Sequence, residues 1–125
     1  MTLDEWRFSL EIAWDDAWFR WQTSLTLASV MLGSLFFLWR LIPVGLRNGQ
    51  LIFHYNLYLG IDEVHAWWWV LFVPILLILV VLGNIIASAR LFRRDKIASR
   101  VLLCASTVFT VLLFLAAFFI TSVNV

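Results

Sequence analysis

The sequence has few of the charged residues that keep ordinary soluble domains in water. Charged side chains make up 14% of its 125 residues and hydrophobic ones 63%, against about 25% and about 45–50% in typical soluble domains. A soluble domain of this size would still expose roughly a third of the surface of its unfolded chain. It could not hide so much apolar surface, so the composition predicts an integral membrane protein.

Residues that carry common chemistry are also scarce. The single cysteine, Cys104, lies within an apolar run, which excludes a disulfide within the chain and any CxxC motif. GxSxG, HExxH and a glycine-rich phosphate loop are all missing. The one carboxylate pair outside the N-terminal segment, Asp62 and Glu63, is adjacent, so its side chains would point apart. The sequence therefore favours a protein that is not an enzyme.

Three long apolar runs stand out instead. They predict membrane-spanning helices over residues 25–42, 63–89 and 101–123, each near or above the ~18 residues that cross roughly 30 Å of hydrocarbon. The first should stop at Pro43, because proline pushes the preceding residue out of helical geometry. Pro74 lies inside the second and should kink it. The expected fold is an all-α membrane protein with three transmembrane helices.

The predicted spans carry little charge. No acidic residue lies within their apolar runs, at residues 25–42, 67–89 and 101–123, and Arg40 is near enough to an end to reach the headgroups. The chain alone is therefore a poor pump, although several copies could form a small transporter or channel. Small residues spaced four apart allow close helix packing, either within the chain or between copies; these pairs are Ser29/Gly33, Gly83/Ala87 and Ser106/Thr110.

The distribution of basic residues predicts the orientation. Seven of the nine lie in the N-terminal segment or in the basic loop at residues 90–100, and basic residues near the spans favour the cytoplasmic side. We expect a bacterial inner-membrane protein with its N-terminus in the cytoplasm and its C-terminus outside. The same loop could bind anionic headgroups, although orientation alone accounts for it. Its basic residues are Arg90, Arg93, Arg94, Lys96 and Arg100.

Residues 2–22 predict an amphipathic helix. Apolar side chains recur there at helical spacing opposite acidic ones, and Thr2 with Glu5 fits a capping box. We expect this helix to lie on the membrane surface until the chain turns inward near residues 22–24. An acidic helix gains nothing from anionic lipid, so docking to a partner stays open. The tryptophans expected to anchor the chain at the two interfaces are Trp14, Trp18, Trp21, Trp67, Trp68 and Trp69.

The outer loop at residues 43–62 is expected to be extended. Asn48–Gly49 lies between two apolar stretches and suits the type I′ turn of a short hairpin. Asp62 would cap the second helix, with Glu63 in its first turn. Alternation over residues 53–62 predicts a strand with one polar face. The predicted ligand- or partner-binding residues are His54, Tyr55, Asn56, Tyr58, Gly60 and Asp62.

Two cofactor hypotheses compete with partner binding at this loop. Asp62 and His65 are three apart and would share one face of a helix, so His54 and Glu63 could complete four metal ligands. A histidine could also ligate a haem or pigment, although neither histidine lies inside the apolar run of a predicted span. Because exposed histidines at a membrane surface are the simpler interpretation, we expect no cofactor.

The outer segment "FHYNLYLGIDE" resembles a bacterial family. Small three-span membrane proteins carry a similar HYN-x-Y-x-G-x-D segment between their first two spans. They are similar to a domain of unknown function at the start of toxin-immunity and signalling membrane proteins. The resemblance covers residues 51–81 by motif and the whole chain by layout. It departs where the family has proline before the histidine, since this chain has Phe53 there, and it implies no catalytic residues.

The sequence thus predicts a non-enzymatic membrane protein whose outer loop binds a ligand or partner, in the manner of an immunity, sensing or accessory subunit. The alternatives are an oligomeric transporter or channel subunit and a metal- or pigment-binding subunit. The expected partners are the lipid bilayer and either a membrane protein or further copies of this chain, with no nucleic acid.

Overall fold

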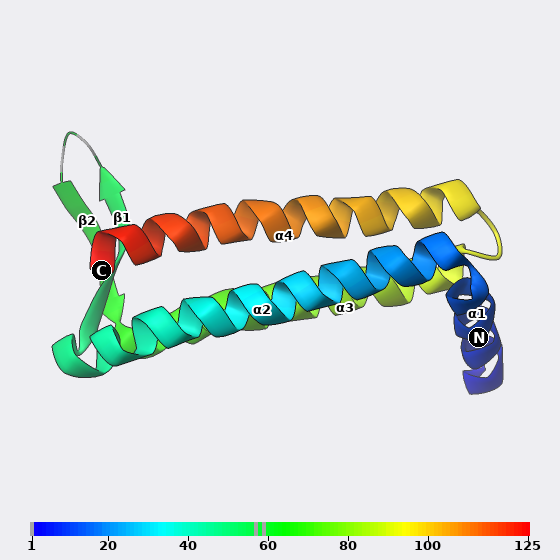
Figure 1. Ribbon diagram of the computed structural model, residues 1–125, viewed down its shortest axis with the longest axis horizontal. Helices are drawn as coiled ribbons and strands as arrows, with labels where there is room; N and C mark the ends of the chain where they lie inside the picture. The colour runs from blue at the N-terminus through cyan, green and yellow to red at the C-terminus, as the bar shows by residue number, and fades with distance from the viewer. Residues whose placement is uncertain (1, 57, 59) are drawn as a thin grey trace.

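Three long helices run side by side in the computed structural model (Figure 1). They are α2 (Ala17–Asn48), α3 (Phe72–Leu91), which follows a 3₁₀ helix η1 (Trp67–Leu71), and α4 (Lys96–Asn124). The structure describes residues 2–56, 58 and 60–125, and between residues 54 and 63 it describes the backbone alone, except at Tyr58. All three helices are long and apolar enough to cross a membrane, which confirms the predicted multi-pass layout.

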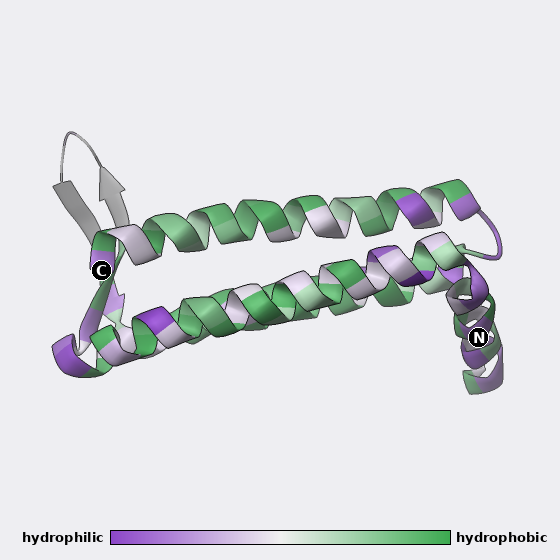
Figure 2. Ribbon diagram, viewed as in Figure 1, coloured by the Kyte–Doolittle hydropathy of each residue, from purple (hydrophilic) through white to green (hydrophobic). Residues whose placement is uncertain are grey.

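The two ends of this bundle differ. Helix α1 (Leu3–Asp15) crosses one end, and a hairpin of β1 (Gln50–Asn56) and β2 (Gly60–Ala66) stands across the other (Figure 1). We refer to them as the α1 end and the hairpin end. Green apolar residues dominate the three long helices, whereas purple hydrophilic ones gather on α1 and near the helix ends (Figure 2). The polar elements are therefore placed where a bilayer would meet water.

The N-terminal helix is shorter than predicted. Residues 2–22 are not one helix, because the chain breaks at Asp16, whose extended backbone (φ −73°, ψ 118°) ends α1 and begins α2. The Asp16 side chain accepts a hydrogen bond from the Phe19 N–H at 3.0 Å and so caps α2. The capping box of Thr2 and Glu5 is confirmed. Aspartate favours the N-cap position, so α1 ends at Asp16 even though the apolar periodicity of the sequence continues beyond it.

The predicted end of the first span at Pro43 is wrong, and so is the turn at Asn48–Gly49. Helix α2 continues through Pro43 to Asn48, and Gly49 ends it in left-handed geometry (φ 72°), donating its N–H to the Gly45 carbonyl at 2.7 Å. A glycine in this conformation is a common helix end. The pair suited a hairpin turn only on the assumption that a strand preceded it.

The start of the second span also differs from expectation. Asp62 and Glu63 lie in β2 rather than at a helix N-terminus, and the helical region begins only at Trp67. Pro74 is the third residue of α3. Its first-turn position, where an N–H would lack a partner within an α-helix, replaces the predicted mid-span kink.

The predicted basic loop at residues 90–100 is mostly helical. Helix α3 extends to Leu91 and α4 already begins at Lys96, because Asp95 accepts hydrogen bonds from the Ile97 and Ala98 N–H groups at 3.0 and 2.9 Å. Only residues 92–95 connect the two helices. The cap fixes where α4 starts and places Arg100 inside its second turn.

Hydroxyl groups join the helices near the α1 end. Ser88 and Ser99 are fully buried and each donates to the other's carbonyl, at 2.8 and 2.9 Å. Thr107 accepts a hydrogen bond from Gln22 at 2.6 Å, and its hydroxyl lies 3.0 Å from that of Thr26. Such pairs satisfy polar groups that lipid could not hydrate. They connect α4 to α3 and to α2 respectively.

Small residues allow close packing at particular points. A Cβ atom at Gly33 would lie 2.0 Å from Phe114 of α4, and one at Gly45 would lie 2.6 Å from the Cβ of Trp67. Ser106 and Thr110 are buried, which places this pair at contacts within the chain. Around Gly83, by contrast, an added Cβ meets nothing within 4 Å.

Candidate functional site

The outer segment forms a hairpin instead of the single predicted strand. Its strands pair antiparallel, with Gln50 opposite Ala66 and Asn56 opposite Gly60, and the register shifts on either side of His54. The chain reverses direction between Asn56 and Gly60. Alternation along residues 53–62 therefore did not describe one continuous strand, because the chain turns back in the middle of it.

The predicted binding residues divide between the two strands. His54, Tyr55 and Asn56 lie near the end of β1, and Gly60 and Asp62 lie in β2. The polar face predicted for their side chains lies outside the described residues. Tyr58 is described in the turn, and its side chain is 93% exposed.

The metal hypothesis began from a helix that does not form. Asp62 and His65 lie in a strand, so the three-residue spacing that would share a helical face does not apply. Among the side chains that the structure describes, no three metal-ligating groups gather. The described His65 ring instead stacks on Trp69 at 4.9 Å and meets the edge of Phe53 at 5.6 Å. These aromatic contacts help to hold the base of the hairpin.

A pair of hydrogen bonds between Asn124 and Ile52, which we call the clasp, joins the hairpin to the end of α4. The sequence did not predict it. The Asn124 amide donates to the Ile52 carbonyl at 2.6 Å, and its oxygen accepts from the Ile52 N–H at 2.8 Å. One side chain thus pairs with β1 much as a neighbouring strand would. Isolated two-stranded hairpins are marginally stable, so this contact helps to fix the hairpin relative to the helices.

The clasp covers one edge of the hairpin and leaves the other open. Ile52 is paired in register with Val64. Because the Ile52 N–H and C=O point outward to Asn124, this is a non-hydrogen-bonded pair, and Val64 directs its own N–H and C=O to the opposite edge. Apart from pairing within the hairpin itself, no described hydrogen bond reaches the Val64 backbone, and its side chain is 45% exposed. Edges of this kind can accept a further strand.

Replacing Asn124 with alanine is expected to release the hairpin. The substitution removes both hydrogen bonds to Ile52, each contributing about 1 kcal/mol, while α4 itself should persist. Hydrogen–deuterium exchange of residues 50–56 should then rise relative to the wild type, with exchange in α3 unchanged. Asn124→Asp is the matched control, because it keeps the acceptor for the Ile52 N–H and loses the donor. Unaltered exchange in Asn124→Ala would contradict the clasp.

The tryptophans expected at the interfaces occupy different environments. Those of the α1 end are exposed, Trp21 most of all at 73%. In the triplet, Trp68 and Trp69 are exposed, whereas Trp67 packs against the buried cluster that contains Leu41 and Val70. Trp67 therefore joins the hairpin to α2, a role that the predicted aromatic belt did not include.

At the α1 end, Asp16 connects three helices. Besides capping α2, its carboxylate lies 3.1 Å from Lys96 Nζ and 3.5 Å from Arg100 Nη2 at the start of α4. The hydrogen bond from the Phe19 backbone, with Lys96 and Arg100 nearby, holds the pKa of Asp16 below its ordinary value, although desolvation acts in the opposite direction. Two of the five basic residues assigned to orientation thus also have a structural partner.

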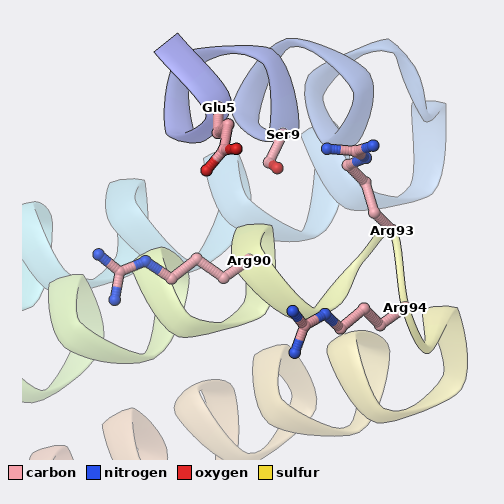
Figure 3. Close-up of a pocket in the computed structure, with 5 residues that line it drawn as sticks. All are labelled: Glu5, Ser9, Arg90, Arg93 and Arg94. Atoms are coloured by element: carbon pink, nitrogen blue, oxygen red, sulfur yellow. The ribbon is translucent and has the colours of Figure 1, made fainter. Parts of the chain in front are cut away.

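The other three basic residues border a groove between α1 and the end of α3. Arg90, Arg93 and Arg94 line it together with Glu5 and Ser9 of α1, and its volume is about 420 Å³ (Figure 3). Arg93 also lies over the Phe8 ring, with its guanidinium carbon 5.1 Å from the ring centre. The sequence showed the basic cluster but not the packing of α1 against it, so the groove could not be predicted.

The comparisons with known proteins gave no relative. No family model matches the chain, and neither a curated protein nor a solved structure is significantly similar to it.

Proposed function

We propose that the chain is a non-enzymatic protein of a bacterial inner membrane that binds a partner protein through its hairpin, as an immunity, sensing or accessory subunit does. In this arrangement the N-terminus and the α1 end lie in the cytoplasm, and the hairpin and C-terminus lie outside. The excess of basic residues at the α1 end supports this orientation.

The observation that carries the proposal is the asymmetry of the hairpin edges. Asn124 covers the β1 edge at Ile52, while the β2 edge at Val64 remains open. Strand addition uses such an edge, because main-chain hydrogen bonds supply affinity and neighbouring side chains supply selectivity. The exposed Tyr58 ring at the turn adds an aromatic contact of the kind enriched in interfaces. The resemblance of this segment to a domain of unknown function at the start of toxin-immunity and signalling membrane proteins is in keeping with this proposal.

Replacing Val64 with proline should block the partner without unfolding the hairpin. Proline lacks the N–H that faces the open edge, and edge strands tolerate it where that N–H is not used within the sheet. A photo-crosslinking residue at position 58 should give partner adducts in cells, and Val64→Pro should reduce their yield about tenfold.

Val64→Thr is the matched control, since it keeps the backbone N–H and a β-branched side chain. Exchange protection of residues 50–56 shows whether the hairpin is intact in each variant. Equal adduct yields in the two variants, with equal protection, would reject strand addition at this edge. A wild type that gives no adducts at position 58 would reject the hairpin as the docking element.

A further inference from the structure

We propose that the groove at the α1 end binds the phosphate group of an anionic phospholipid. This site lies at the opposite end of the bundle from the hairpin and does not depend on partner binding there. Its walls are Arg90, Arg93 and Arg94, and α1 contributes Glu5 and Ser9 to the other side. In Figure 3 both α1 side chains project toward the space that the arginines border.

Ser9 gives the first indication of a ligand. Only 2% of this residue is exposed, and its hydroxyl has no hydrogen-bond partner among the described contacts. The hydroxyl oxygen is not itself one of the buried side-chain atoms that lack a hydrogen-bond partner; because Ser9 lines the groove, its hydroxyl is available to an occupant there. Ser9 Oγ could donate to a phosphate oxygen, and it lies on the face of α1 that the arginines approach.

The charges around the groove favour an anion. Arg90 and Arg94 form no ion pair with any described carboxylate, and the nearby Asp16 is already paired with Lys96 and Arg100. Among the described residues that line the groove, Glu5 is the only acidic one, and it accepts a hydrogen bond from the Thr2 N–H at 3.0 Å. Three guanidinium groups against one carboxylate leave a positive site, and arginine matches phosphate geometry especially well.

The position of the groove identifies the phosphate as that of a lipid. Arg90 lies in the last turn of α3, and Ile86, one turn earlier on the same face, is 41% exposed. Leu82, a further turn away, is 43% exposed. A phosphate held by the arginines would therefore have its acyl chains beside an exposed apolar stripe. A free phosphate compound would gain nothing from this stripe.

Lipid retention by the purified full chain tests the proposal. Native mass spectrometry would compare phosphatidylglycerol with phosphatidylcholine of the same acyl chains. Wild-type protein should retain phosphatidylglycerol preferentially, and Arg90→Gln/Arg94→Gln should lower its occupancy about tenfold. The control Arg7→Gln/Arg20→Gln removes the same charge from the same end but outside the groove, and should change occupancy by less than about twofold.

Two single variants test the groove without removing an arginine. Glu5→Gln should raise phosphatidylglycerol occupancy about threefold, because it removes the opposing charge while glutamine still completes the capping box. Ser9→Ala should lower occupancy about fivefold by removing the hydroxyl contact. Their opposite effects distinguish a phosphate site from general damage to α1, since damage would lower occupancy in both.

Three results would overturn the proposal. Equal retention of the two lipids by the wild type would remove the preference for an anion. Equal losses of phosphatidylglycerol occupancy in the Arg90/Arg94 variant and the Arg7/Arg20 control would show that general surface charge, and not the groove, retains the lipid. Binding of glycerol 3-phosphate as tight as that of phosphatidylglycerol would show that the acyl chains add nothing, and would assign the groove to a soluble phosphate compound instead.

Discussion

Gly45→Ala is expected to lower the free energy of unfolding by up to about 2 kcal/mol. A methyl group there would lie 2.6 Å from the Cβ of Trp67, an atom fixed close to the backbone of η1, so the two helices would have to separate. Overpacking of this kind costs about 1–3 kcal/mol, whereas helix propensity alone favours alanine by about 1 kcal/mol. Unfolding by steric trapping in bicelles would measure the net change.

Gly83 provides the matched control for this substitution. It lies in α3, where an added Cβ meets nothing within 4 Å, so Gly83→Ala should gain up to about 1 kcal/mol from helix propensity. Both variants gain helix propensity, so they should differ by the overpacking cost of about 1–3 kcal/mol. Gly45→Ala should also raise hydrogen exchange in the hairpin base. Equal stability of the two variants would mean that α2 and η1 do not pack closely at Gly45.

Asp16→Ala is the second variant with a large expected effect. It removes the cap of α2, which contributes about 1 kcal/mol, and the contacts with Lys96 and Arg100. We expect a loss of about 1–2 kcal/mol, most of it from the cap, because ion pairs with partly exposed lysine and arginine contribute little. Asp16→Asn should lose less, since its side-chain oxygen can still accept the Phe19 N–H.

The same contacts give stability a pH dependence with a defined sign. The pKa of Asp16 is lowered in the folded state from an ordinary value of 3.8. Its stabilising contribution is therefore fully present above that value and is lost as pH falls through the lower folded pKa. The stability difference between wild type and Asp16→Asn should be constant from pH 7 to 5 and shrink below pH 4. A constant difference down to pH 2.5 would contradict the lowered pKa.

Hydropathy over long windows predicted the main architecture correctly. Three runs of apolar residues became three helices, because backbone hydrogen bonds in lipid must be satisfied within the segment. The start of the first helix was also predicted correctly, since Thr2 and Glu5 form the expected capping box. These features depend on residues close together in the sequence, which is why they could be predicted from the sequence alone.

The predictions that failed concerned features that depend on contacts between residues far apart in the sequence. Pro43 was expected to end α2, but the helix continues to a turn where Gly45 fits against Trp67. The Asn124 clasp joins residues 72 positions apart, and no local pattern marks it. The groove depends on α1 folding back over the end of α3 after the break at Asp16, so its arginines could be recognised only as an orientation signal.

The distance between the hairpin and Asn124 along the chain also sets an order of events during biosynthesis. Strand β2 ends at Ala66 and Asn124 follows 58 positions later, so at about 5–20 residues per second the complete hairpin exists for roughly 3–12 s before its clasp has been translated. During that interval both strand edges are uncovered, and a waiting partner or chaperone could pair with either. Completion of α4 then closes one edge, so that translation itself selects which side of the hairpin remains available.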